Sequence, residues 1–241
     1  MNLNPYPAAQ KIAAALFAVC LAVGATSAQQ PDQAAVIQRI DAAVKARLDG
    51  IESYTVNEHY AVFRGDDETH PAAEMSVKTT YQEKTGKSYS ILSQSGSSLI
   101  QNAVLKPLLD NEKLINQPGN REASWITSAN YAMKLRSGAP QQLDGRECLV
   151  LDLSPIRTAP NLIQGTVWVD AKDGSIVQLQ GTATKSPSFL TGPAEVLRHY
   201  ANVSGFAQAT RARAVSNSFL FGKTVITIDY RDYQIQLRSA K

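Results

Sequence analysis

Residues that could act as nucleophiles or metal ligands are scattered along the chain. The three histidines, His59, His70 and His199, never occur at the i, i+4 spacing that brings two imidazoles to one metal ion. The Gly-x-Ser-x-Gly motif that positions a nucleophilic serine is absent from the sequence. Cys148 lies in an apolar run, which favours a buried structural thiol over a nucleophile. The sequence therefore predicts no catalytic residue, no metal site and no cofactor.

Two short runs resemble fragments of catalytic motifs, but neither motif is complete. Lys84-Thr85-Gly86 copies the Lys-Thr-Gly element of penicillin-binding enzymes, whereas their Ser-x-x-Lys motif occurs nowhere in the chain. Gly86-Lys87-Ser88 ends like a phosphate-binding loop, but Tyr81 stands where that loop requires its first glycine. A hydrolase of esterase type is therefore the third of three hypotheses, and the sequence names no serine for it.

Composition narrows the class of protein. The chain has 241 residues, with 24 Lys and Arg against 21 Asp and Glu, which gives a formal charge of +3. Nucleic-acid-binding domains carry a larger basic surplus, so no nucleic-acid partner is expected. A hydrophobic content of 44% argues against a disordered chain, and two cysteines cannot make a disulfide scaffold.

The first 28 residues have the order of a secretory signal peptide. Lys11 is their only charged residue, and an uninterrupted apolar run follows at 12–25. That run is shorter than the ~20 residues that a membrane-spanning helix needs. Small residues then precede the Ala28–Gln29 bond, whereas the residue before Cys20 is too large for lipoprotein processing. We predict cleavage after Ala28 and a periplasmic location, which leaves Cys148 as the only mature cysteine.

A helix is expected first in the mature chain, over residues 32–49. Its apolar residues recur at intervals of three and four, which gives one buried stripe. The stripe consists of Val36, Ile37, Ile40, Val44, Leu48 and then Ile51. Asp32 can cap the start of the helix, and Gly50 stands where a left-handed glycine would end it.

Strand signals then alternate with one helical insertion. Three strands are expected in the ranges 54–63, 75–83 and 88–92. Residues 97–130 are helical in pattern, and Pro107 predicts either a kinked helix or two shorter ones. The C-terminal half continues as a strand meander in the ranges 147–153, 165–170, 175–181, 195–203, 209–217 and 223–237.

These patterns predict an α+β fold in one domain over residues 29–241. About ten antiparallel strands form a single sheet, and twist should curl such a sheet into an incomplete β-barrel. An N-terminal helix precedes the sheet, and an inserted helical lid at about 97–130 would cover its open mouth or concave face. An apolar concavity of this kind suits an apolar ligand.

One hairpin resembles a known family. The Asp144-Gly145 turn leads into a strand. The next strand carries the run Thr166-Val167-Trp168-Val169-Asp170, and a turn that contains Gly174 connects it to Ile176. This pattern, over about residues 144–182, resembles a hairpin of the periplasmic outer-membrane lipoprotein-sorting proteins, the LolA/LolB-like family. The order of helices and strands is also similar over residues 32–236. The resemblance implies a half-barrel whose cavity, closed by a helical lid, holds acyl chains.

Candidate ligand-binding residues are large apolar side chains in the lid, in the C-terminal strands and in their loops. We expect the cavity or its rim to include Leu105, Leu109, Trp125, Trp168, Phe189, Leu190 and Phe219. For Trp168 and Phe219 ordinary core packing is the alternative. Phe189 and Leu190 lie in a loop rich in Ser, Pro and Gly, where they either pack on the rim or contact a lipid or partner.

The leading hypothesis is a non-enzymatic carrier, monomeric and periplasmic, that buries the acyl chains of lipids or lipoproteins. Its partners would include inner- or outer-membrane proteins. The second hypothesis is an envelope sensor or scaffold that uses the same fold to bind a protein. Neither hypothesis requires a cofactor.

Overall fold

A computed structural model of the chain describes residues 31–159, 161–185, 193–218 and 222–239. The predicted signal peptide at 1–28 lies outside the described residues, as do Phe189, Leu190 and Phe219.

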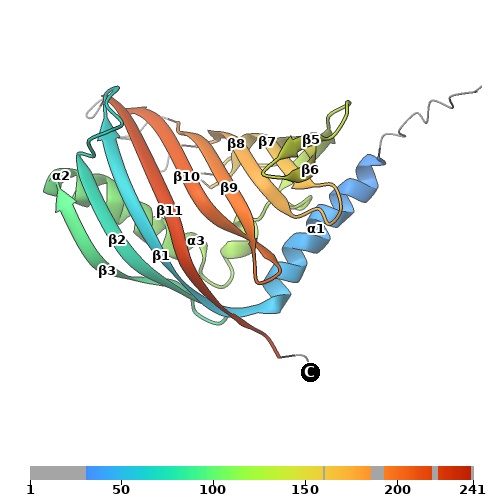
Figure 1. Cartoon of the computed structure of the whole chain (residues 1–241), viewed down its shortest axis with the longest axis horizontal. Helices are drawn as coiled ribbons and strands as arrows, with labels where there is room; N and C mark the ends of the chain where they lie inside the picture. Colours follow the sequence, from blue (N-terminus) through green and yellow to red (C-terminus); the bar gives the residue numbers. More distant parts are fainter. Residues whose placement is uncertain (1–30, 160, 186–192, 219–221, 240–241) are drawn as a thin grey trace, which may run out of the picture.

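The described residues form one antiparallel sheet of eleven strands (Figure 1). The strand order is β3-β2-β1-β11-β10-β9-β8-β7-β6-β4, and β5 pairs with β6 beside β4. The strands are β1 (Ile51–Arg64), β2 (Ala73–Gln82), β3 (Gly86–Gly96), β4 (Tyr131–Leu135), β5 (Gln141–Leu143), β6 (Arg146–Pro155), β7 (Ile163–Asp170), β8 (Ile176–Ala183), β9 (Glu195–Val203), β10 (Phe206–Ser218) and β11 (Gly222–Leu237). Because β3 and β4 do not pair with each other, the barrel is incomplete, which confirms the predicted fold class.

Helix α1 (Gln33–Gly50) follows the sequence prediction at its start and differs at its end. The Asp32 carboxylate accepts hydrogen bonds from the backbone N–H groups of Ala34 and Ala35, at 3.4 and 3.2 Å. Gly50 is the last helical residue, and it is not in the left-handed conformation that we expected of a terminal glycine. A Cβ at Gly50 would lie 2.4 Å from Phe206 Cζ, so any side chain here would force the Phe206 ring of β10 to move.

The predicted helical insertion is present and covers one part of the sheet. It comprises α2 (Ser98–Ile100), the π-helical turn η1 (Gln101–Leu105), α3 (Lys106–Ile115) and the 3₁₀ turn η2 (Arg121–Ser124). Pro107 lies in the first turn of α3, directly after the π-helical turn. The irregularity at this proline is thus a π turn, which widens the helix locally within a continuous helical run over residues 98–115.

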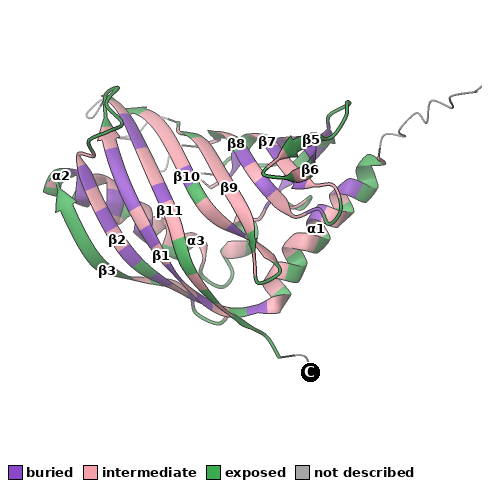
Figure 2. Cartoon of the chain, in the orientation of Figure 1, coloured by how far each residue is buried: buried purple, intermediate pink, exposed green. Residues whose placement is uncertain are grey.

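Two separate apolar clusters stabilise the two sides of the molecule (Figure 2). On the β4–β7 side, Val36 and Ile40 of α1 pack with Leu151 and Val167. On the β1–β3 side, the lid packs on Tyr60, Val62, Met75 and Val77 through Ile100, Leu105 and Leu109. In the described ranges no helix has the length and apolar character needed to cross a bilayer. No group of three potential metal ligands occurs in the same ranges.

Candidate ligand cavity

A cavity of about 730 Å³ lies between the concave face of the sheet, α1 and the lid. Its size falls within the ~300–1,000 Å³ range of small-molecule sites. The lining side chains come from α1, from η1 and α3 of the lid, and from strands on both sides of the sheet. The fold therefore brings residues from positions 42 to 233 to one cavity.

One part of the cavity wall is apolar. Val104, Leu108 and Ile115 contribute side chains from the lid. Ile163 and Leu179 contribute side chains from β7 and β8. This part of the wall has the chemistry of a site for a hydrocarbon chain, because burial of apolar surface is the dominant favourable term in such binding.

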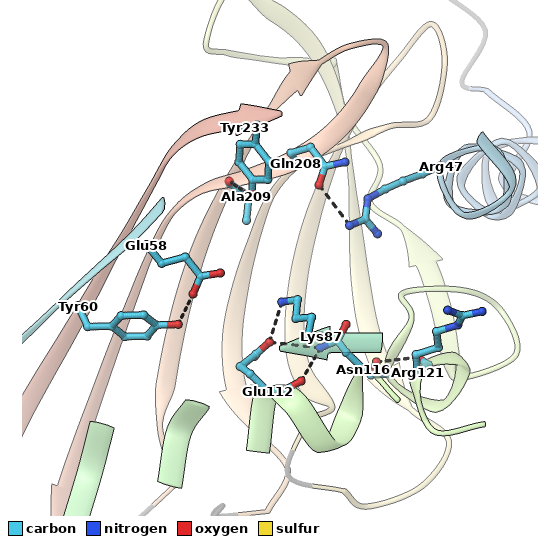
Figure 3. Close-up of polar contacts among 11 residues, drawn as sticks. Arg47, Glu58, Tyr60, Lys87, Glu112, Asn116, Arg121, Gln208, Ala209 and Tyr233 are labelled. Atoms are coloured by element: carbon cyan, nitrogen blue, oxygen red, sulfur yellow. Dashed lines mark hydrogen bonds and ion pairs between the residues drawn. The ribbon is translucent and has the colours of Figure 1, made fainter. Parts of the chain in front are cut away.

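Tyrosines form a second part of the wall, on β1, β2 and β11. The rings of Tyr54 and Tyr81 stack with centroids 5.0 Å apart, and Tyr233 lies against Tyr54 at 5.9 Å. The Tyr233 hydroxyl donates a 2.9 Å hydrogen bond to the Ala209 carbonyl (Figure 3). Burial is the main factor that raises the pKa of Tyr81, Tyr230 and Tyr233. These phenols therefore stay neutral and offer the cavity both ring faces and hydroxyl groups.

Two carboxylates that line the cavity each have a partner within the protein. Glu58, which is 4% exposed, accepts a hydrogen bond from the Tyr60 hydroxyl. Glu112 of α3 forms a 3.1 Å ion pair with Lys87 of β3 and also accepts from Asn116 (Figure 3). Burial favours a neutral acid at Glu112, but Lys87 and then Arg198 hold the pKa of that carboxyl below its ordinary value. Both acids are thus occupied as hydrogen-bond acceptors.

Four cations line the same cavity, and two of them have nitrogen atoms without a protein partner. Arg121 is held by the Tyr81 hydroxyl and the Glu83 carbonyl, at 2.9 and 2.7 Å. Arg47 Nη2 donates to Gln208 Oε1 at 3.2 Å, while Arg47 Nε has no acceptor among the described residues. Arg198 on β9 interacts with Tyr200, and its Nε likewise lacks an acceptor in the described ranges. The cavity therefore holds spare hydrogen-bond donors.

The residues expected at the cavity are only partly brought together. Trp125 lines it. Leu105 and Leu109 do not line it; both belong to the apolar cluster that packs the lid on β1 and β2, at 0% and 2% exposure. Trp168 is the register partner of Val150, one residue out of phase with the inward-facing Val167, and its Nε1 donates to Gln141 on β5. Their ligand-binding roles stay predictions, and the geometry favours Trp125 alone.

The polar residues of the cavity were missed in the sequence. A signal did exist for one of them: Glu58 alternates with Tyr54, Val56 and Tyr60, so it shares the inward face of a strand with apolar side chains. Arg198 and Lys87 had no comparable signal, because their strands show no clean alternation of burial.

Comparisons with known proteins return only structural neighbours. No family model and no curated protein matches the chain. A LolA superfamily protein from Nitrosomonas europaea is 13% identical, covers 86% of this chain and 94% of its own, and has a TM-score of 0.44. A putative outer membrane lipoprotein-sorting protein domain from Vibrio parahaemolyticus is 12% identical, with coverages of 83% and 92% and a TM-score of 0.46. The MucA/MucB complex of Pseudomonas aeruginosa follows at 10% identity, with coverages of 84% and 94% and a TM-score of 0.28.

The first two neighbours carry the family name that the hairpin motif around Trp168 resembles. All three TM-scores are below 0.5, so the neighbours say nothing about what this chain binds. What the chain binds is therefore inferred from the residues that line the cavity.

Proposed function

We propose that the chain is a non-enzymatic carrier of the bacterial periplasm that holds an acyl chain of a lipid or lipoprotein in its cavity. The observation that carries the proposal is the cavity of about 730 Å³ with an apolar wall of lid and strand residues. Each buried CH₂ group contributes ~0.8 kcal/mol, so ten methylenes give about 8 kcal/mol before the cost of immobilising the ligand. An acyl chain can therefore bind well without any covalent chemistry.

The periplasmic part of the proposal rests on the order of charged, apolar and small residues in the first 28 positions. Cleavage after Ala28 would leave residues 29–241 as a single domain. Because the cavity is built within one chain, a monomer is sufficient for binding. N-terminal sequencing of the exported protein and light scattering on a sizing column check these two points.

A matched pair of variants tests the site. Ala214 on β10 lines the cavity, so Ala214→Trp should fill part of it and weaken binding of a fluorescent fatty acid at least tenfold. Thr227 of β11 lies between the inward-facing residues Ile226 and Ile228, so its side chain is on the opposite face. Thr227→Trp adds the same ring there and should leave the affinity within about twofold of the parent protein.

Equal binding by both variants and the parent would overturn the carrier proposal. The two other hypotheses give different results in related assays. A stoichiometric membrane-protein partner captured from envelope extract, with no affinity for lipid, would favour the sensor or scaffold. Esterase activity lost on replacing one serine would favour the hydrolase.

A further inference from the structure

Several buried side-chain donors of the described residues lack an acceptor, and most of them line the cavity. Within the described residues, the buried side-chain atoms that lack a partner are Nε of Arg39, Arg47 and Arg198, and Nε2 of Gln208. All four are N–H donors, and three of the four residues line the cavity. No buried side-chain acceptor of the described residues is left without a donor.

Gln208 is the most informative of these residues. Its side chain is 2% exposed, so water reaches it only by way of the cavity it lines. Its Oε1 accepts from Arg47, and Figure 3 shows the Arg47 side chain extending from α1 toward it. This contact fixes the amide so that Nε2 remains as the free donor. A buried donor without an acceptor is destabilising, which makes a ligand acceptor at this place favourable.

The charged side chains that line the cavity give it a positive excess, which favours an anionic ligand as the unpaired donors do. Arg47, Lys87, Arg121 and Arg198 line it, against Glu58 and Glu112 inside and the exposed Asp173 in the turn before β8. Because Glu112 is bonded to Lys87 and Asn116, it does not neutralise Arg198 completely. Arg198 cannot lose its proton in a protein, so its charge persists.

The positions of these donors suit an amphiphile. Arg198 is the register partner of Leu179 on β8, so the cation adjoins the apolar wall. Gln208 on β10, whose register partner on β9 is Ala201, lines the same cavity. The donors and the hydrocarbon wall therefore share one cavity.

We propose that the ligand is a single-chain amphiphile with an anionic carboxylate or phosphate headgroup, held inside the cavity by Arg198, Arg47 and Gln208. This inference rests on the carrier function and names its ligand class. Arg198 acts as the charged anchor, because a guanidinium matches the geometry of both anions. Gln208 Nε2 supplies a neutral donor, and the acyl chain extends along the lid.

The test compares three probes with the same C16 chain: hexadecanoate, hexadecyl phosphate and hexadecan-1-ol. Each is titrated against the full mature protein by displacement of a fluorescent fatty acid. The parent protein should bind at least one anion about tenfold or more tightly than the alcohol, since charge-assisted hydrogen bonds add that much. The ratio between the two anions identifies carboxylate or phosphate as the natural headgroup chemistry.

Arg198→Met should remove this preference and leave the affinity for the alcohol within about threefold of the parent. Arg198→Lys should keep part of it, because the positive charge remains. Arg211→Met is the matched control: Arg211 lies on the neighbouring strand, pairs with Asp229 and does not line the cavity, so the preference should persist.

The outcomes separate the two proposals. Equal binding of all three probes by the parent protein overturns the anionic headgroup and leaves the carrier intact. An anion preference that survives in folded Arg198→Met overturns the role of Arg198. No binding of any probe overturns both proposals. If Arg198→Met does not fold, the parent ratio and Arg198→Lys still decide the question.

Discussion

The concave face of the sheet is covered in two different ways. On the β4–β7 side, α1 packs directly on the strands, and Val36 and Ile40 are at 1% and 0% exposure against residues such as Leu151. On the β1–β3 side, Glu112 of the lid pairs with Lys87, and both Lys87 and Glu58 line the cavity. Both sides have an apolar cluster, but Leu151 and the α1 residues packed on it lie outside the cavity, whereas the β1–β3 side adds charged groups to the cavity wall. This difference predicts that stability and binding can be changed separately.

The largest expected effect is on stability alone. Leu151→Ala removes a side chain at 0% exposure within the α1 cluster, so the free energy of unfolding should fall by about 2–5 kcal/mol. Urea denaturation measures this loss. Because Leu151 does not line the cavity, the ratio of anion to alcohol affinity should not change. A changed ratio would mean that the two sides are coupled.

A smaller effect is expected where the lid meets the sheet. Glu112→Gln removes the charge from the lid's ion pair and leaves the Lys87 ammonium partly buried, with 18% of its side chain exposed. Stability should fall by about 1–3 kcal/mol, and amide exchange in α3 should accelerate. Adding Lys87→Met should recover part of the loss, because no unpaired charge then remains.

The exposed pair Lys45–Asp49 is the control for this result. Its side chains are 74% and 60% exposed, so Lys45→Met should change stability by less than about 1 kcal/mol. If the double variant at positions 87 and 112 were no more stable than Glu112→Gln, the ion pair would not be what holds the lid.

The same ion pair predicts the behaviour of the protein in acid. Burial alone would raise the pKa of Glu112, but Lys87 and then Arg198 hold that pKa below its ordinary value. The unfolded state therefore binds the proton first as pH falls. The stabilisation is present above the usual glutamate range and is lost as pH falls through it toward the folded pKa. Glu112→Gln should reduce the stability lost between about pH 6 and pH 3, measured by urea midpoints.

The smallest effect on stability at neutral pH is expected from the tyrosines, because their hydroxyl groups ionise only at alkaline pH. Burial is the first cause that raises the pKa of a set of six tyrosines. They are Tyr60, Tyr81, Tyr89, Tyr131, Tyr230 and Tyr233. The unfolded state ionises first, so the stability is intact below about pH 10 and is lost as pH rises toward the folded values.

Absorbance at 295 nm against pH should therefore show most phenols titrating late and together with unfolding. Early titration of the whole set, without a change in circular dichroism, would contradict the buried positions of these rings.

Much of the fold could be predicted from local patterns. The stripe beginning at Val36 and the cap at Asp32 define α1, and the Asp-Gly turns define hairpins. The short strands β4 and β5 were not anticipated, because five and three residues are too few to establish an alternation. Gly50 was predicted to end the helix in a left-handed conformation, whereas its close neighbour in the structure, Phe206, is more than 150 residues away in the sequence.

The cavity could be expected in outline, but its chemistry could not. Large apolar residues such as Leu105 were natural candidates, but Leu105 packs between the lid and the sheet and does not line the cavity, whereas the buried Gln208 does. Arg198, Lys87 and Gln208 come from three strands whose register only the folded sheet defines. Sequence patterns report which residues are apolar; they do not report which polar groups meet across a curved sheet.

Native mass spectrometry of the protein, exported to the periplasm and purified without detergent, tests the central claim most directly. The carrier account predicts a chain that begins at residue 29 with one single-chain anionic amphiphile bound, which is released when the protein is denatured. A ligand-free protein that also fails to take up added hexadecanoate or hexadecyl phosphate would contradict it.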